Sequence, residues 1–183
     1  WDEQLIRYGT AIHNKRVSFI EAFIPFFQHY YKWISQEQES VSLNYESKLS
    51  EMDFRTLIQQ AYPKDMRVHY TSVGIHKDDI TFLLEGLPIK RFGSQGQQKS
   101  FLIALRLAQF DWLKERLKQT PILLLDDIFD KLDNLRVAQL MELVSKNTFG
   151  QVLVTDTDET RVSAIFETIR VKPNMIIFNS ELV

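Results

Sequence analysis

Apolar and aromatic residues recur at helical spacing through the first part of the chain. Between residues 2 and 38 they fall on one stripe, formed by Leu5, Tyr8, Ile12, Phe19, Phe23, Phe26 and Tyr30. This spacing predicts a helix with one packed face. Because proline lacks the N–H donor of a helical turn, we expect Pro25 to kink or interrupt this helix.

The pattern becomes alternating from residue 40. Apolar residues at every second position predict a short strand over 40–46, and a second helix is expected over about 50–69. Alternation returns at 80–84, where Glu85-Gly86 has the composition of a turn into a partner strand over 87–90. The alternating residues are Val41, Leu43 and Tyr45 in the first strand, and Ile80, Phe82 and Leu84 in the second.

The last third of the chain alternates between helical and strand patterns. A helix is expected over about 97–118, with Phe101, Leu105, Ala108 and Trp112 on one face. The apolar runs 122–125 and 151–155 predict strands that are buried on both faces. Helices are expected over about 134–147 and from about 158, and a last strand near 175–178. This order predicts an α/β fold, with a parallel-rich sheet covered by helices.

Composition narrows the class of protein. The 183 residues suffice for one sizeable domain, or for one domain with a small helical attachment. A net charge of −2 excludes a general basic field for nucleic acid, and the lack of cysteine excludes disulfides and thiolate sites. The lack of cysteine fits a protein of the reducing cytoplasm, which we expect here. No run of the sequence is typical of a membrane span or a secretory signal. Because the chain begins with Trp1 inside helical sequence, it is expected to be an excised segment.

Two acidic residues end the apolar run 122–125. Asp126 and Asp127 would lie at the carboxyl edge of the sheet, where open α/β sheets bind ligands. In phosphate-loop NTPases an Asp at this position helps to hold Mg²⁺, and a second carboxylate in reach of the attacking water can polarise it. The alternative is that both residues only terminate the strand.

The segment 91–100 opens the long helix with small and polar residues. Ser94 can cap the helix, whose free N–H groups and dipole favour a phosphate. An ordinary capped helix start is the alternative. The same residues nearly spell a phosphate-binding loop, from Gly93 to Lys99-Ser100, but Gln98 stands where its second glycine belongs. We therefore infer the acidic strand of a nucleotide site without its phosphate loop.

Together, these motifs resemble the RecF family of ABC-type ATPases. The resemblance is strong over about residues 60–160 and looser in the opening helix. It rests on five segments: Gly74-Ile-His-Lys-Asp-Asp79, Phe92-Gly-Ser-Gln-Gly-Gln-Gln-Lys99, Ala104-Leu-Arg-Leu-Ala108, Pro121-Ile-Leu-Leu-Leu-Asp-Asp127 and Gln151-Val-Leu-Val-Thr155.

The resemblance implies a domain organisation and a nucleotide site. Residues 1–60 would be the remainder of a helical arm, and residues 61–183 the C-terminal ABC ATPase lobe, whose partner lobe carries the phosphate loop. ATP would be clamped between two protomers. Asp126 would help to hold Mg²⁺ and Asp127 would polarise the attacking water. The residues implied to touch ATP across the dimer are Ser94, Gln95, Gly96, Gln97 and Asp133.

The sequence departs from the family pattern at two places. Asp130-Lys-Leu-Asp133 stands where the family usually has Ser-Glu-Leu-Asp, which adds a negative charge near bound phosphates. Many ABC ATPases place a γ-phosphate-sensing His after the strand that corresponds to 151–155. Thr155 or Asp156 occupies that place here, so no sensor is assigned.

The resemblance also implies a role in DNA repair. RecF-like proteins recognise gaps and junctions between single- and double-stranded DNA, and act with RecO and RecR and as ATP-dependent homodimers. Lys77, Lys90 and Arg91 are the candidate phosphate contacts, with a solvated basic surface as the alternative. His76 beside Asp78 and Asp79 gives a weak metal pattern, which the resemblance explains better as a structural turn.

Two other functions remain open at this point. An SMC-like structural ABC ATPase would need a long heptad coiled coil, and residues 2–38 are too short and too aromatic for one. A module without catalytic function would need only an interface, which does not require the paired carboxylates of Asp126 and Asp127.

Overall fold

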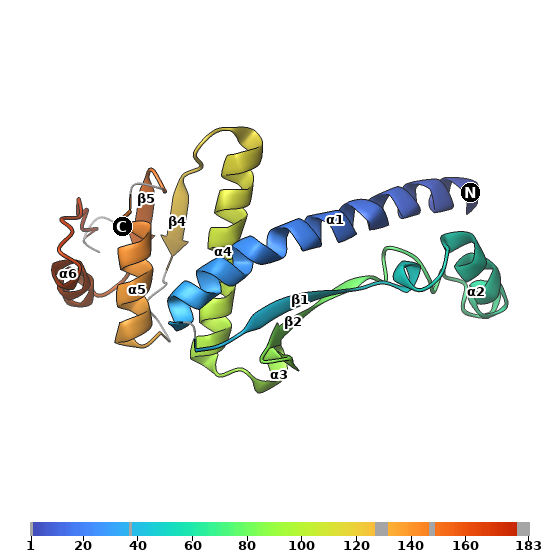
Figure 1. Cartoon of the computed structure of the whole chain (residues 1–183), viewed down its shortest axis with the longest axis horizontal. Coiled ribbons are helices and arrows are strands. Elements are labelled where there is room, and N and C mark those ends of the chain that lie inside the picture. The colour runs from blue at the N-terminus through green and yellow to red at the C-terminus, as the bar shows by residue number, and fades with distance from the viewer. Residues whose placement is uncertain (1, 37, 127–131, 147–148, 179–183) are drawn as a thin grey trace. The chain divides into compact units, whose positions relative to one another are not determined.

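The structure is a computed structural model that describes residues 2–36, 38–126, 132–146 and 149–178 (Figure 1). Within these ranges the chain divides into two compact units, Trp1–Trp112 and Leu113–Val183. No described helix is long and apolar enough to cross a membrane.

A single helix, α1 (Asp2–Ser35), opens the first unit and confirms the expected helical segment. It continues through Pro25, so of the two expected effects, a kink or an interruption, the interruption does not occur. The physical reason lies in the packing, because Phe23 and Phe27 are both buried on either side of the proline. Burial of two aromatic side chains offsets the hydrogen bond that proline cannot donate.

Helix α1 packs through its aromatic residues on α4 (Gln95–Leu117). The rings of Phe27 and Phe101 have centroids 4.6 Å apart, and Trp112 stands edge-on to Phe19 at 5.2 Å. The Tyr30 hydroxyl donates to the Asp111 carboxylate and closes the same interface. The expected stripe is thus confirmed in its second half, whereas Tyr8 at its beginning is exposed.

Three antiparallel strands form the sheet of the first unit, in the order β1, β2, β3. Strand β1 (Val41–Glu46) pairs with β2 (Asp79–Leu84), and β2 with β3 (Leu87–Pro88). The strand expected over 87–90 is only two residues long, because Pro88 has no N–H to extend the ladder and the chain turns into the short helix α3 (Ile89–Phe92). The sheet contains the hairpin that the sequence predicts. The described strands form two separate sheets, this antiparallel one and a parallel pair, so the expectation of a parallel-rich sheet is confirmed only for the parallel pair.

A small separate core lies where α1 begins. It forms between α1, the turn η1 (Lys48–Ser50) and helix α2 (Phe54–Val68), at the end of the β1–β2 ribbon away from α3 (Figure 1). The Phe54 ring fills it so tightly that a Cβ on Gly9 or Gly74 would come within 2.3 and 2.8 Å of ring carbons. Gly74 also has φ of +120°, which side chains rarely allow.

The second unit contains the parallel pair that the sequence predicts. Strand β4 (Leu123–Asp126) pairs with β5 (Val152–Thr155), and two helices follow the strands, α5 (Asn134–Val144) and α6 (Glu159–Thr168). The strands are not buried on both faces: Leu124 is 68% and Leu153 49% exposed. This prediction is wrong because, within the described residues, the sheet has only these two strands and one face lies open.

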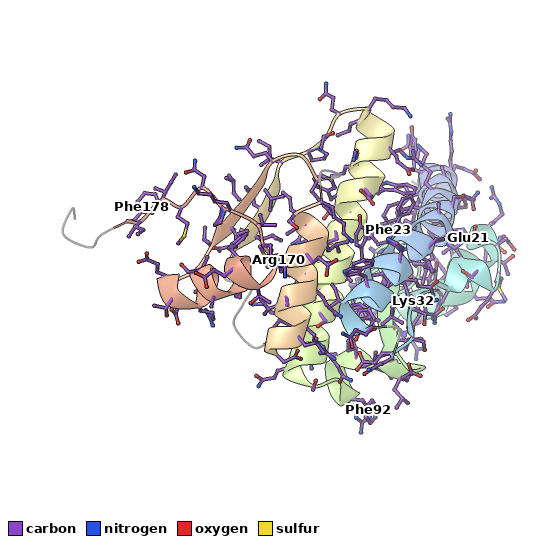
Figure 2. The ribbon with its side chains drawn as sticks, turned by 60° about the vertical axis from the view of Figure 1, so that its left-hand side comes forward. Glu21, Phe23, Lys32, Phe92, Arg170 and Phe178 are labelled. Carbon is purple, nitrogen blue, oxygen red and sulfur yellow. The ribbon has the colours of Figure 1, made fainter. Side chains whose placement is uncertain are left out.

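The strand expected near 175–178 is also absent from the described part of the chain. Residues 171–178 have no regular structure, and Phe178 is 91% exposed and points away from the ribbon (Figure 2). A strand needs hydrogen bonds from a neighbouring strand, and among the residues that the structure describes, β4 and β5 pair only with each other. The expected domain division at residue 60 stays a prediction; β1 and β2 pair across that position.

Candidate functional site

The start of α4 is held by a reciprocal cap. The Ser94 Oγ accepts from the Gln97 backbone N–H at 3.2 Å, and the Gln97 side-chain oxygen accepts from the Ser94 N–H at 2.8 Å. This is a capping box, in which two polar groups at a helix start satisfy each other. The sequence-predicted cap at Ser94 is therefore confirmed, and its partner is Gln97.

The Gln97 amide also links the helix start to the segment after α1. Its Nε2 donates to Glu39 Oε1 at 2.8 Å, and the other oxygen of Glu39 accepts from the buried Tyr31 hydroxyl at 2.6 Å. With its oxygen and nitrogen both engaged, the Gln97 side chain is oriented by the protein itself. Glu39 is a residue that the motif alone did not point to.

Gly93 precedes the cap and lets the chain fold closely on itself. A Cβ at Gly93 would lie 2.6 Å from Ile89 Cγ1 and 2.8 Å from the Ile89 carbonyl oxygen. The Gly93 N–H donates to that carbonyl at 2.8 Å and ends α3. The close approach at this glycine is thus to its own backbone, which places Ser94 at the helix start.

The capped start of α4 has the features of an anion-binding helix N-terminus. The backbone N–H groups of Gln95 and Gly96 lie in the first turn, where a helix supplies no carbonyl acceptor. The helix dipole adds partial positive charge at the same place. Four sequence-predicted residues, Ser94 to Gln97, therefore stand together in a setting that suits a phosphate.

Two of the three candidate DNA contacts lie beside this helix start. Lys90 and Arg91 are exposed on α3, and the Arg91 guanidinium lies 5.3 Å from the centre of the Phe92 ring. Phe92 projects outward from its helix (Figure 2) and is 58% exposed, a feature that the sequence did not reveal. Lys77 is not part of this group, because it precedes β2 at its other end and lies 5.3 Å from the Tyr70 ring centre.

The motif from Gly74 to Asp79 forms a structural turn. Asp78, whose side chain is almost fully buried, accepts from Arg16 at 3.2 Å and from the Tyr45 hydroxyl at 2.5 Å. Burial and then the Asp78 bond raise the pKa of Tyr45. His76 bonds instead to the Thr71 carbonyl, and no group of three metal-ligating side chains occurs in the described residues.

The carboxyl edge of the parallel sheet belongs to the second unit. Asp126 ends β4 and is exposed there, directly opposite Thr155 in the register of β5. The Thr155 hydroxyl donates to Asp126 Oδ1. Asp127, the predicted water-polarising residue, lies outside the described residues. So does Asp130, which opens the segment that departs from the family pattern.

An ion pair fixes the turn that follows β5. Arg161 donates to both oxygens of Asp156 at 2.7 Å, and the Asp158 N–H donates to Asp156 Oδ1 at 2.8 Å. Burial by itself would raise the pKa of the Asp156 carboxyl, but these hydrogen bonds outweigh it and hold that pKa below its ordinary value. Asp156, one of the two residues that the resemblance gives as alternatives for the place of the sensor His, is therefore an ionised anchor for the start of α6.

Asp133 caps helix α5. Its carboxylate accepts from the Arg136 N–H at 2.9 Å and pairs with the Arg136 guanidinium at 3.5 Å. This local role is compatible with a further contact across a dimer, which stays a prediction. The candidate residues thus form two groups in different units, Ser94–Gln97 in the first and Asp126 with Asp133 in the second.

Asp126 suits the hard cation that the family resemblance implies. Mg²⁺ is commonly held by one or two carboxylates together with substrate phosphates, rather than by a cage made only of protein. An exposed carboxylate at a strand end, in a region where the described residues form no larger ligand cluster, fits that coordination.

Several curated proteins that resemble the chain are RecF proteins. The chain is 53% identical over 168 residues to the DNA replication and repair protein RecF of Flavobacterium johnsoniae, covering 92% of this chain and 47% of that protein. The corresponding protein of Bacteroides thetaiotaomicron is 44% identical over 169 residues, covering 92% and 46%. The chain thus spans about half the length of these relatives. No protein-family model matches it.

Solved structures give the same comparison at the level of the fold. The chain aligns with the recombination mediator protein RecF-ATPrS in the RecFOR pathway with a TM-score of 0.71 and 23% identity, over 86% of this chain and 44% of that one. The RecF-ATP structure gives a TM-score of 0.69 at 24% identity, with the same coverage. Both likenesses concern the mixed α/β fold of part of a longer chain.

Proposed function

Because the chain is a RecF-like segment, about half as long as the RecF proteins that it matches, we propose that it forms the C-terminal lobe of a RecF-type ABC ATPase. Residues 1–60 are the remainder of its helical arm. The match over 92% of the chain carries this proposal. The capped start of α4 supports it, because its structure suits the phosphate contact that the proposal requires.

In this proposal, the start of α4 contributes contacts to an ATP molecule that is bound by a second protomer. The backbone N–H groups of Gln95 and Gly96 and the Ser94 hydroxyl contact the γ-phosphate, while Gln97 keeps the helix start in shape through Glu39. Asp133 lies across the same interface. The site is therefore complete only in an ATP-dependent homodimer.

The acidic residues at the end of β4 contribute to the binding site of the protomer's own nucleotide. Asp126 holds the Mg²⁺ that accompanies ATP, and this ion neutralises charge on the phosphates. Asp127 polarises the attacking water. Hydrolysis then acts as a slow switch of DNA binding, with single- to double-strand junctions and gaps as the DNA, RecO and RecR as protein partners, and the cytoplasm as the compartment.

Exposed side chains beside α4 are the proposed DNA contacts. Lys90 and Arg91 supply positive charge, and Phe92 supplies an exposed ring on which an unpaired base can stack. A Lys90→Glu, Arg91→Glu double variant should weaken DNA binding and lower its dependence on salt, measured by fluorescence anisotropy over a salt series. A variant with unchanged affinity and salt dependence would remove this surface from the proposal.

Calorimetric titration of Mg-ATP tests the proposed half-site. The 183-residue chain alone should bind no nucleotide, because its sequence lacks the phosphate-binding loop. The complete RecF-like protein that contains this chain should bind it and hydrolyse it. Micromolar binding to the chain alone would mean that residues 93–100 hold phosphate without a second protomer, and would overturn the two-protomer site.

Two substitutions in the complete protein separate the proposed roles. Asp127→Asn should abolish hydrolysis but keep ATP binding, and normal turnover would refute the role of Asp127. Ser94→Arg should keep ATP binding but prevent dimerisation. Light scattering with and without ATP measures the dimerisation. Dimers that still form with ATP would refute the contact in trans.

A further inference from the structure

A side-chain hydrogen bond joins the two strands at the carboxyl edge of the second sheet. Asp126 and Thr155 are register partners on neighbouring parallel strands, and the Thr155 hydroxyl donates to Asp126 Oδ1. Within the described residues Asp126 Oδ2 makes no hydrogen bond. One oxygen of this exposed carboxylate is thus held by the protein.

A hydroxyl in this position changes what the carboxylate can do. The χ2 torsion of Asp is broad, so an exposed aspartate at a strand end samples many orientations of its two oxygens. A donor on one oxygen restricts this torsion and leaves a single oxygen for a cation. Partners of this kind, which do not touch the metal, orient its ligands and strengthen binding.

We propose that Thr155 is a positioning residue that orients the Asp126 carboxylate so that Oδ2 binds the divalent cation. The inference rests on the proposed role of Asp126 in holding Mg²⁺. Thr155 would thus have a role at a place where the family resemblance gives Thr155 and Asp156 as alternatives for a missing sensor. Thr155 acts here through Asp126 and needs no contact with the nucleotide.

The turn after β5 keeps the Thr155 hydroxyl in place. Asp156 directly follows Thr155, and its buried carboxylate is held by both Arg161 bonds and by the Asp158 N–H. Asp158 in turn caps α6 through the Arg161 N–H at 3.0 Å. The backbone on one side of Thr155 is therefore fixed by strand pairing, and on the other side by the helix start.

Manganese binding tests the inference without relying on turnover. Mn²⁺ replaces Mg²⁺ and is visible by electron paramagnetic resonance, so its affinity can be titrated in the complete RecF-like protein with ATP present. Thr155→Val keeps the branched shape and removes the hydroxyl, and should weaken Mn²⁺ binding about tenfold or more. Thr155→Ser keeps a hydroxyl and should stay within about twofold of the original affinity.

Further variants identify which claim fails. Asp126→Ala should lose most of the Mn²⁺ affinity, and if it does not, both the proposed metal role and the positioning role are overturned. If Asp126→Ala loses the ion while Thr155→Val binds it normally, only the positioning role is overturned. Circular dichroism checks the fold of each variant, and Thr155→Ala, which should match Thr155→Val, serves if the valine variant is unstable.

The metal-free state provides a second readout. ATP affinity measured in the presence of EDTA should be the same for the original protein and for Thr155→Val, because the inferred role concerns only the cation. An equal loss of ATP affinity with and without metal would show a general structural effect and overturn the positioning role.

Discussion

The two sheets of this chain differ in how completely they are covered. In the first unit, alternate residues of β1 are buried, including Val41 and Leu43, and α1 packs along the strand. In the second unit, β4 and β5 each bury or half-bury alternate residues, but Leu124 and Leu153 stand side by side on an open face. One face of the first sheet is thus covered by residues of its own unit, whereas the second sheet keeps an uncovered apolar face within the described residues.

This difference explains why nearly continuous apolar strands are found in a two-stranded sheet. Runs such as Ile122–Leu125 are typical of parallel strands that are buried on both faces. Exposed apolar patches often mark surfaces that another part of a protein covers. We infer that the sequence of the second unit is adapted to a larger sheet, in agreement with the proposal that the chain is one lobe of a longer ATPase.

Leucine truncation in each sheet should give the largest contrast. Leu43→Ala should cost about 2–5 kcal/mol, because Leu43 is buried, whereas Leu124→Ala should cost less than about 0.5 kcal/mol. Urea unfolding monitored by tryptophan fluorescence reports on the first unit, since all three tryptophans lie in residues 1–112. Amide hydrogen exchange reports on the second unit. Equal costs would mean that the Leu124 face is covered within this chain.

The buried carboxylate of the first unit should give the next largest effect. Asp78→Ala leaves the Tyr45 hydroxyl without its acceptor and should lower the free energy of unfolding by about 1–3 kcal/mol. Little of this comes from Arg16, whose side chain is 44% exposed. Asp79→Ala is the matched control at the exposed neighbour. If both variants unfolded at the same urea concentration, Asp78 would have no stabilising role.

The two helix caps should give similar, smaller effects in their own units. Ser94→Ala should destabilise the first unit by about 1 kcal/mol and Asp133→Ala should destabilise the second by about the same amount, because each removes an acceptor of a helical N–H. Fluorescence-detected unfolding and hydrogen exchange measure the respective losses. Ser94→Asp retains an acceptor and should be nearly neutral, so a full loss in that variant would contradict the capping role.

A rise to alkaline pH should give the smallest difference in stability between the two units. Burial, followed by the bond to Asp111, raises the pKa of Tyr30, and Tyr45 is shifted in the same direction. The stability contributed by these neutral hydroxyls is fully present below the ordinary tyrosine pKa of about 10, and is lost as the pH rises through the raised values. The second unit contains no tyrosine. A pH series of fluorescence-detected urea unfolding should therefore decline less steeply in Tyr45→Phe, and an unchanged slope would contradict this.

Helices and isolated strands could be predicted from the sequence because their signals are local. The spacing of Phe23 and Tyr30, the alternation around Leu43 and the cap at Ser94 each depend on neighbours a few residues away. Burial of β4 on both faces could not be predicted correctly, because it depends on which other strands are present. The strand near 175–178 was predicted wrongly for the same reason.

The candidate site was predictable only as a set of motifs. Ser94 and Gln97 lie three residues apart, so their mutual cap follows from spacing, but Glu39 reaches Gln97 from far along the chain. Likewise, the register of two distant strands brings Thr155 to Asp126. The roles of Asp126, Asp127 and the residues proposed to act in trans stay predictions that the experiments above can decide.

The tight packing of Gly9 and Gly74 against the Phe54 ring restricts which substitutions this protein can accept over evolution. Gly9, Phe54 and Gly74 lie far apart in the sequence, yet the ring leaves no room for a Cβ at either glycine. A substitution at one of the three positions is tolerated more easily after a compensating change at another, for example a smaller residue in place of Phe54. Among homologues, these positions should therefore covary as a group, and the order in which changes occur should matter.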